Sequence, residues 1–223
     1  MSELKDFFPV WNKLTKIQQE KLEAAAMAKT FQEEDIVHNG TECSGFLIVK
    51  SGQLRAHISS EEGREITIYR LFERDTCMFS GSCMMSSLQF DITIQAEKKS
   101  EIWLISPKVF RSLMEESTAV ANFMNEIMAT RLSDIMWLIE QVMWKSFDKR
   151  LASFLIEESS IEENLQLKIT HERIANHLGT AREVVTRMLK YFQNEGMVKL
   201  TRGAIEITNL EKLEELSESA PPA

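Results

Sequence analysis

The sequence predicts an α+β fold with an N-terminal β-roll of the jelly-roll type, one long helix and a C-terminal winged helix-turn-helix. Short apolar or alternating runs between residues 31 and 106 are separated by turn residues, which is typical of an antiparallel jelly roll. The segment from Val120 to about Trp144 contains neither Gly nor Pro, which favours a single long helix. Two amphipathic segments then flank Gly179, and a hairpin pattern follows them. We therefore expect three parts, at residues 1–117, 118–145 and 146–223.

The composition is typical of a soluble globular protein, since 43% of the 223 residues are hydrophobic and 27% are charged. No apolar run reaches the roughly 18 residues that a membrane-spanning helix needs. The N-terminus, MSELKDFFPVWNKL, contains acidic residues and no apolar signal-peptide core, so we expect a cytoplasmic protein. Three cysteines are too few for a secreted disulfide framework, and reduced thiols are expected.

The N-terminal part is predicted to begin with a helix and to continue as strands. Trp11, Leu14, Ile17 and Leu22 recur at helical spacing, which predicts a helix over residues 1–29. The runs GFLIVKSGQLRAHIS, EEGREITIYRLF and FDITIQAEKKSEIWLIS then predict successive strands joined by turns. Near the other end of the chain, the acidic tail LEELSESAPPA is expected to be frayed.

Apolar residues along the long helix form a seam with the spacing of about two heptads. Neighbouring faces are apolar as well, and a helix that is apolar on several faces is buried on more than one side. One face can pack on the β-roll and another on a second copy of the chain, so we interpret it as a dimerisation helix. An ordinary core helix is the alternative. The predicted seam consists of Met128, Leu132, Ile135, Ile139 and Val142.

The stretch THERIANHLGTAREVVTRMLKYFQNEG, residues 170–196, predicts two helices set at a sharp angle. Thr170 is placed to cap the first helix, Gly179 permits the turn, and Thr180 is placed to cap the second. We expect His177 on the surface of the turn. The predicted inward faces consist of Ile174, Ala175 and Leu178 in the first helix and Val184, Val185, Met188, Leu189 and Phe192 in the second.

The other side of the second helix is polar and fits a major groove of DNA. Arg can bond guanine through two parallel hydrogen bonds, and Glu can accept from cytosine. Hydroxyls and helix N-terminal amides can donate hydrogen bonds to phosphates. The hairpin GMVKLTRGAIEIT would act as a wing along the DNA backbone. The predicted DNA contacts are Thr170, His171, Thr180, Arg182, Glu183, Thr186, Arg187, Lys190 and Arg202.

The net charge of −8 indicates that any nucleic-acid binding uses a local basic surface. Residues 146–223 contain 10 Lys and Arg against 13 Asp and Glu, a net of −3. The alternative interpretation of the two helices is a helical hairpin with a solvated charged face. No nucleophile–base–acid set or Gly-rich phosphate loop is present in the sequence, so we do not expect an enzyme. A β-roll regulatory subunit of a larger assembly is a further alternative, but it would not need a helix-turn-helix.

The segments ITHERIANHLGTAREVVTRMLKYF, FLIVKSGQLRAHISSEEGREITIYRL and RLASFL resemble the CRP/FNR family of bacterial transcription regulators over nearly the whole chain. The resemblance implies a β-roll like those that bind cyclic nucleotides, a dimerisation helix and a winged helix-turn-helix. It also implies a homodimer that binds an inverted-repeat operator, reads bases with Arg182, Glu183 and Arg187, and recruits or blocks RNA polymerase according to an effector sensed in the β-roll.

Two effectors of that family are not expected here. Members that bind cyclic AMP carry a Gly-Glu pair and then an Arg-Ser pair, whereas this chain has Gly81-Ser82 and, later, Phe90 and Asp91. An Asp would repel a cyclic phosphate, and Ile135 and Met136 replace the hydroxyls that would meet adenine. Members with an oxygen-sensing iron–sulfur cluster carry an N-terminal cysteine group, but residues 1–42 contain no Cys and three thiols cannot supply four ligands.

The cysteines leave three interpretations open. Cys77 and Cys83 are a C-x5-C pair that could form a thiol switch or bind a soft metal, and we take them as effector candidates. The alternative is that these two cysteines are small apolar fillers of the barrel, in Met-rich surroundings; Cys43 is the third cysteine of the chain. A small ligand or a haem in the β-roll is the third possibility, since CMFSGSCMM is rich in Cys and Met and His57 lies in the barrel, although that spacing matches no haem motif.

Overall fold

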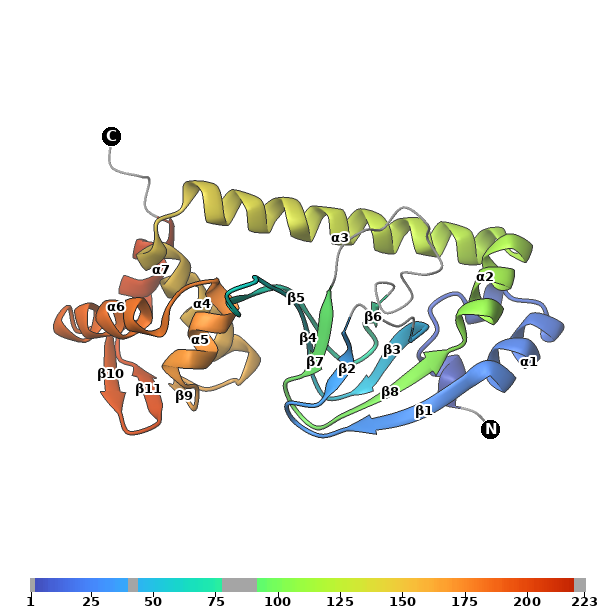
Figure 1. Ribbon diagram of the computed structural model, residues 1–223, viewed down its shortest axis with the longest axis horizontal. Coiled ribbons are helices and arrows are strands. Elements are labelled where there is room, and N and C mark those ends of the chain that lie inside the picture. Colours follow the sequence, from blue (N-terminus) through green and yellow to red (C-terminus); the bar gives the residue numbers. More distant parts are fainter. Residues whose placement is uncertain (1–2, 40–43, 78–91, 219–223) are drawn as a thin grey trace. The chain divides into compact units, whose positions relative to one another are not determined.

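A computed structural model describes residues 3–39, 44–77 and 92–218. The chain forms two compact units (Figure 1). Unit 1 comprises residues 1–58 and 68–135, and unit 2 comprises residues 59–67 and 136–223. Within the described ranges, no helix is both long and apolar enough to cross a membrane. The predicted architecture of β-roll, long helix and winged helix-turn-helix is confirmed.

The predicted N-terminal helix over residues 1–29 is wrong at both ends. The segment begins with the short 3-10 helices η1 (Glu3–Asp6) and η2 (Trp11–Lys13), and α1 spans only Lys16–Ala25. A capping box starts α1, in which the Thr15 side chain accepts from Gln18 N and the Gln18 side chain accepts from Thr15 N. Residues after Ala25 join a strand, because the backbone from Ala26 to Phe31 pairs with a strand near residue 100.

Two antiparallel four-stranded sheets form the β-roll of unit 1, and their orders are β1-β8-β3-β6 and β2-β7-β4-β5. Their buried residues make one core, in which Phe46 stacks on Phe110 with ring centroids 4.0 Å apart. The strands are β1 (Ala26–Phe31), β2 (Ile36–His38), β3 (Phe46–Ser51), β4 (Leu54–Ser59), β5 (Glu65–Leu71), β6 (Thr76–Cys77), β7 (Thr93–Ala96) and β8 (Ser100–Ile105).

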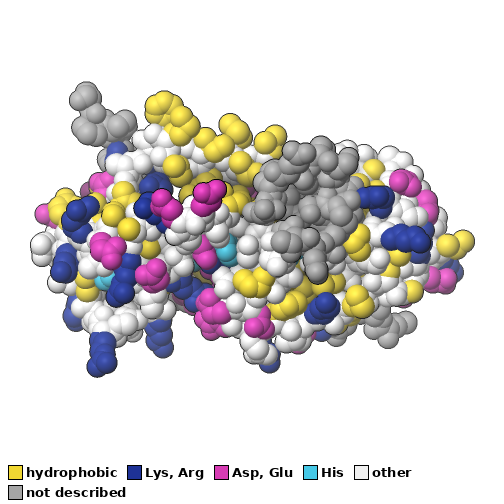
Figure 2. Space-filling model, viewed as in Figure 1, with side chains coloured by type: hydrophobic (Ala, Val, Ile, Leu, Met, Phe, Trp, Pro, Cys, Tyr) yellow, Lys and Arg dark blue, Asp and Glu magenta, His cyan; other side chains and the backbone are white. Residues whose placement is uncertain are grey.

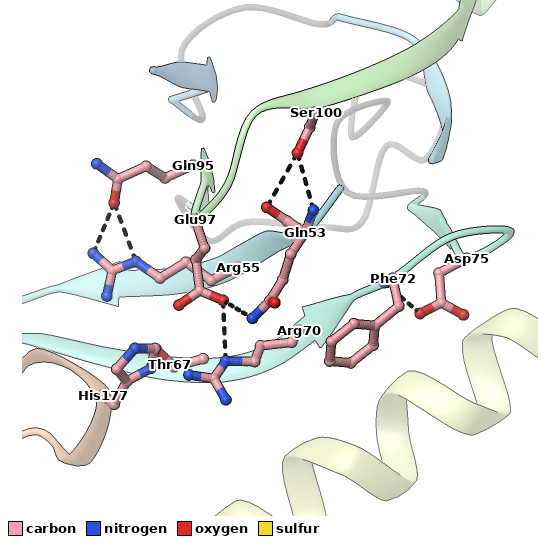
Figure 3. Close-up of polar contacts among 10 residues, drawn as sticks. All are labelled: Gln53, Arg55, Thr67, Arg70, Phe72, Asp75, Gln95, Glu97, Ser100 and His177. Atoms are coloured by element: carbon pink, nitrogen blue, oxygen red, sulfur yellow. Dashed lines mark hydrogen bonds and ion pairs between the residues drawn. The ribbon is translucent and has the colours of Figure 1, made fainter. Parts of the chain in front are cut away.

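A buried polar cluster ties three segments of the β-roll together (Figure 3). The Glu97 carboxylate accepts from Gln53 Nε2 at 2.8 Å and pairs with Arg70 Nε at 3.0 Å. The Ser100 hydroxyl receives the Gln53 backbone N–H at 3.0 Å. Because a buried charge is costly unless it is paired, this cluster holds the strands in one register.

Helix α2 (Pro107–Glu116) follows the last strand of the roll, with Pro107 at its first turn. Helix α3 (Thr118–Trp144) is the predicted long helix, 27 residues without a break. Its N-terminal half buries Val120, Met124 and Ile127 in the core of unit 1. The helix therefore extends the β-roll core along one of its faces.

Unit 2 contains the predicted winged helix-turn-helix around a second core. Leu151, Leu155, Leu189 and Phe192 are fully buried there. The predicted frayed tail is wrong for its described part, because Leu210–Glu218 form the helix α7, which buries Leu213 and packs against α4 (Phe147–Ile161). The elements are α4 (Phe147–Ile161), β9 (Gln166–Leu167), α5 (His171–Leu178), α6 (Arg182–Asn194), β10 (Val198–Thr201), β11 (Ala204–Ile207) and α7 (Leu210–Glu218).

Candidate nucleic-acid interface

Helix α5 begins at the predicted cap. Thr170 has extended backbone angles, and its hydroxyl accepts from Arg173 N at 3.1 Å. Ile174 and Ala175 point into the core of unit 2 and are almost fully buried. One face of α5 is thereby fixed by packing, and its first turn is left at the surface.

The turn between the helices depends on Gly179, which has a left-handed φ of 66°. The backbone N–H groups of Gly179 and Thr180 both donate to Ala175 O, and this closes the C-terminus of α5. Thr180 therefore belongs to the end of α5, and the prediction that it caps α6 is wrong. The N-cap of α6 is Ala181, which makes no side-chain hydrogen bond.

Arg150 supports the same turn, although the sequence analysis did not identify it. Its Nη1 donates to the carbonyl oxygen of Leu178 at 3.2 Å, near the C-terminus of α5. Its guanidinium also lies over the Phe147 ring, with Cζ 5.6 Å from the centroid. The sequence does not predict this role for Arg150, because the contact joins two residues 28 positions apart and follows from no local pattern.

Helix α6 has the polar side that the sequence predicted. Val185, Leu189 and Phe192 are fully buried in the core of unit 2. The opposite side exposes Arg182, Glu183, Arg187 and Lys190, and leaves Thr186 half-buried. Its first two turns therefore present two guanidinium groups and a carboxylate to solvent, which is the chemistry that major-groove recognition uses.

A hydrogen-bonded pair connects the start of α5 to α6. His171 Nδ1 lies 2.9 Å from Thr186 Oγ1, and the same hydroxyl donates to Arg182 O at 2.9 Å. Burial, and then the charge of Arg182, lower the pKa of His171 below its ordinary value. Three residues predicted to contact DNA are thus joined to one another.

His177 is buried, and the prediction that it lies on the surface of the turn is wrong. Only 5% of it is exposed, and its ring centroid lies 5.1 Å from that of Phe154. Its Nδ1 lies 2.9 Å from the hydroxyl of Thr67, which also belongs to unit 2 (Figure 3). The spacing of three from Ile174 is the signal that places His177 on the inner side of α5.

The predicted wing is an antiparallel hairpin of β10 and β11. Arg202 lies at its turn beside Gly203, which has a positive φ of 81°, and both residues are exposed. Lys199 forms an ion pair with Glu206 across the hairpin, at 3.6 Å. Arg202 is therefore the cation at the tip of the wing, and Lys199 lies on the strand behind it.

The C-terminal part of α3 exposes a run of large apolar side chains (Figure 2). Leu132 and Trp144 are 61% and 72% exposed, respectively. Of the predicted seam, Met128 packs against the core of unit 1 and Ile135 is half-buried. The exposed apolar residues of α3 are Leu132, Met136, Trp137, Ile139, Val142, Met143 and Trp144. Several large apolar side chains exposed on one helix mark a candidate interaction site.

One of the two effector cysteines can be placed. Cys77 is a fully buried cysteine at the end of β6, and its Sγ lies 3.4 Å from the Tyr69 hydroxyl. The Arg131 guanidinium covers the Tyr69 ring, with Cζ 4.1 Å from the centroid, and Arg131 pairs with Asp134 at 2.8 Å. Cys43, Cys83 and the segment around Gly81, Ser82, Phe90 and Asp91 lie outside the described residues. The described part of the chain contains no cluster of His, Cys, Asp and Glu able to hold a metal ion.

Comparison with known proteins gives matches to both halves of the chain. The model of the cyclic nucleotide-binding domain matches residues 31–117, and that of the Crp-like helix-turn-helix domain matches residues 149–216. A solved structure from Eubacterium rectale, assigned to the CRP/FNR family of transcriptional regulators, is 55% identical with a TM-score of 0.94. The match covers 96% of this chain and 100% of that chain. This chain belongs to the CRP/FNR family.

Other CRP/FNR relatives are more distant. The cAMP-activated global transcriptional regulator CRP of Pasteurella multocida is 23% identical over 169 residues, which is 73% of this chain and 80% of that protein. A structure of a mutant of CooA from Carboxydothermus hydrogenoformans is 21% identical, with a TM-score of 0.65 and 95% of each chain covered. At this distance the structural likeness shows the shared fold. The family membership makes this protein a DNA-binding transcription regulator of the CRP/FNR type.

Proposed function

We propose that this regulator acts as a homodimer that reads an inverted-repeat operator with α6 and controls transcription with RNA polymerase as a partner. The observation that carries the proposal is the polar side of α6, where Arg182, Glu183 and Arg187 are exposed on a helix whose other side is locked in the core. Thr170, His171 and Thr180 supply groups at the ends of the helices for phosphates, and Arg202 supplies a cation from the wing. Lys190 lies one turn further along the same side of α6.

The apolar surface of α3 supports the homodimer. It includes Leu132, Ile139 and Val142 of the predicted seam, which are 61%, 43% and 45% exposed in the single chain. Covering these side chains with the same surface of a second copy removes apolar area from water. This burial stabilises the dimer by roughly 25 cal/mol per Å² of apolar area. Two-fold symmetry of the protein then matches an inverted repeat in the DNA.

The test of base reading compares Arg187→Ala with Arg202→Ala in operator selection from a randomised duplex library. Arg187→Ala is expected to cost about 1–3 kcal/mol and to relax preference at one symmetric base pair, because a base-edge contact is lost. Arg202→Ala is expected to weaken all sequences alike and to reduce the salt dependence, because a phosphate contact is lost. Unchanged preference in both Arg182→Ala and Arg187→Ala would exclude α6 as the reading helix.

We further propose that the effector is neither cyclic AMP nor an N-terminal iron–sulfur cluster, and that thiol chemistry at Cys77 and Cys83 is the signal. The contacts of Cys77 support this proposal. Its sulfur meets Tyr69, and the Tyr69 ring meets Arg131 of α3. Burial, and then Cys77, raise the pKa of Tyr69, so the phenol stays protonated and can donate to the sulfur. Oxidising the thiol would remove this contact and alter how the helix packs on the roll.

Operator affinity under reducing conditions and after peroxide or polysulfide treatment tests the thiol signal. Wild-type affinity is expected to change by tenfold or more between the two conditions, which corresponds to a typical coupling energy on the order of 1–3 kcal/mol. The affinities of Cys77→Ser and Cys83→Ser are expected to change less. Cys43→Ser serves as the matched control and should respond as the wild type does. Equal affinity in every condition, or a full response in both variants, would make these cysteines structural.

The alternative is a small ligand or a haem in the β-roll, with structural cysteines. The full burial of Cys77 favours this alternative over direct attack by an oxidant from solvent. A native mass spectrum of the purified protein separates the two, because it reports a bound ligand, cysteine oxidation and dimer mass together. Calorimetry with millimolar cyclic AMP is expected to give no saturable heat, although the Pasteurella relative is described as cAMP-activated.

A further inference from the structure

The contact between His171 and Thr186 assigns the protons on the imidazole ring. The Thr186 hydroxyl donates to Arg182 O at 2.9 Å, one turn back in α6. A hydroxyl has a single proton, so it has none left for His171 Nδ1, which lies 2.9 Å from the same oxygen. Nδ1–H is therefore the donor in this contact. In the neutral ring this leaves Nε2 without a hydrogen.

An Nε2 without a hydrogen cannot bind a phosphate, because Nε2 and the phosphate oxygens are then all hydrogen-bond acceptors. No residue of the described part of the chain makes a hydrogen bond to Nε2. Once Nε2 is protonated, the ring becomes a cation with two donors, one for Thr186 and one for an anion. Binding to a phosphate at this position thus requires a proton from solvent.

We infer that His171 is a proton-linked phosphate contact, whose Nε2 takes up a proton as DNA binds while its Nδ1–H holds Thr186 on the reading helix. The inference rests on the proposed function, since it needs the operator complex. The two bonds have different roles. The Nε2 bond fixes a phosphate, and the Nδ1 bond fixes the first turns of α6 relative to that phosphate, so His171 is also a positioning residue for base reading.

Burial, and then the charge of Arg182, favour the neutral ring before DNA binds, because both lower the pKa of His171. Arg182 on α6 acts on it directly, and its repulsion adds to the effect of burial in lowering the pKa of His171. On α5 the neighbouring charged residues are Glu172 and Arg173, and Lys168 precedes the helix. A phosphate has the opposite effect and raises the pKa of the bound ring. Affinity should therefore fall as pH rises from the pKa of the free ring, below about 6.5, to that of the bound ring.

The experiment measures the dissociation constant of the full-length protein from pH 5.5 to pH 8, at constant ionic strength. The probe is a duplex that the wild type selects from a randomised inverted-repeat library. Wild-type affinity should fall by up to about tenfold per pH unit for each His171, and thus up to about a hundredfold per pH unit for a homodimer. Calorimetry in buffers of different ionisation enthalpy should report proton uptake in the same window.

Two variants separate this mechanism from a general effect of pH. His171→Asn places an amide nitrogen where Nδ1 was, so it keeps the contact with Thr186 but cannot take up a proton, and its affinity should be independent of pH. Thr186→Val removes the hydroxyl and frees Nδ1, so the neutral tautomer with Nε2–H can bind the phosphate. Its pH dependence should be weaker than that of the wild type.

The outcomes are distinct. A wild-type affinity that does not vary with pH, or a His171→Asn variant with the full wild-type slope, would overturn the proton-linked contact and leave the proposed function standing. Failure of the wild type to select any duplex would overturn the proposed function, and this inference with it. Circular dichroism of both variants checks that the fold is retained, as expected because His171 and Thr186 are only half-buried.

Discussion

At the scale of single residues, the geometry of the helix-turn-helix depends on Gly179. Its φ of 66° is a conformation that costs other residues about 1–2 kcal/mol, with Asn least affected. A Cβ at this position would also lie 3.1 Å from Ile66 Cδ1 and 3.2 Å from Ile66 Cβ, and the latter is fixed to the backbone and cannot rotate aside. The left-handed backbone and the close approach of Ile66 therefore both favour glycine here.

Substituting Gly179 should reduce stability in a fixed order. Gly179→Ala is expected to lower the free energy of unfolding by about 1–2 kcal/mol, and Gly179→Asn by less, because Asn tolerates the left-handed region. Urea denaturation followed by circular dichroism measures both. An Ala variant as stable as the wild type would show that the turn relaxes into another conformation.

At the scale of elements, α3 has one part that packs on the β-roll and another that is exposed. Its N-terminal half buries Val120 and Met124 in the roll, whereas its C-terminal half exposes Ile139 and Trp144. A sequence with apolar residues on several faces is consistent with either a core helix or a dimer helix. The single chain leaves the second surface uncovered, and this is why the dimer is proposed for that half.

Ile139→Glu should separate the proposed homodimer. It places two glutamates near the symmetry axis, and juxtaposed like charges cost several kcal/mol, so we expect the dimer dissociation constant to rise by about two orders of magnitude or more. Operator affinity should fall in parallel while each half-site contact stays intact. Analytical ultracentrifugation measures the first and a binding assay the second.

Thr130→Glu is the control, since it adds the same charge at an exposed position of the same helix, on the side away from the predicted seam. It should remain dimeric. If Ile139→Glu also remains dimeric and binds the operator, the homodimer is formed by another surface.

At the scale of the whole molecule, the described residues form two separate cores. Phe46 and Phe110 are fully buried in the first, and Leu189 and Phe192 in the second. The overall charge of −8 opposes general attraction to DNA, so the cations of α6 and the wing must act locally. Stability and DNA affinity are thus expected to respond to different sets of residues.

Two cores predict that core substitutions act on one unit at a time. Phe192→Ala and Phe46→Ala should each cost about 3–5 kcal/mol, through lost burial and a residual cavity. Calorimetry should show the first lowering the transition of unit 2 and the second that of unit 1. If either variant shifts a single transition of the whole chain, the units unfold cooperatively.

Much of the candidate site was determined by the sequence alone. The inward and outward sides of α6 follow from the helical period, which is a property of neighbouring residues and needs no tertiary contact. Gly179 and Thr170 were predictable for the same reason, since a left-handed turn and an N-cap are local structures. The alternation and turns that predicted the β-roll are also local patterns.

Only the tertiary structure decided features that depend on residues distant in the sequence. Ala26–Phe31 is a strand because it pairs with Ser100–Ile105, although its sequence continues a helical pattern. The contacts of His171 with Thr186 and of Cys77 with Tyr69 bring together side chains from different elements. A hydrogen bond or a burial site between such segments is set by how the chain folds back on itself, which no local period encodes.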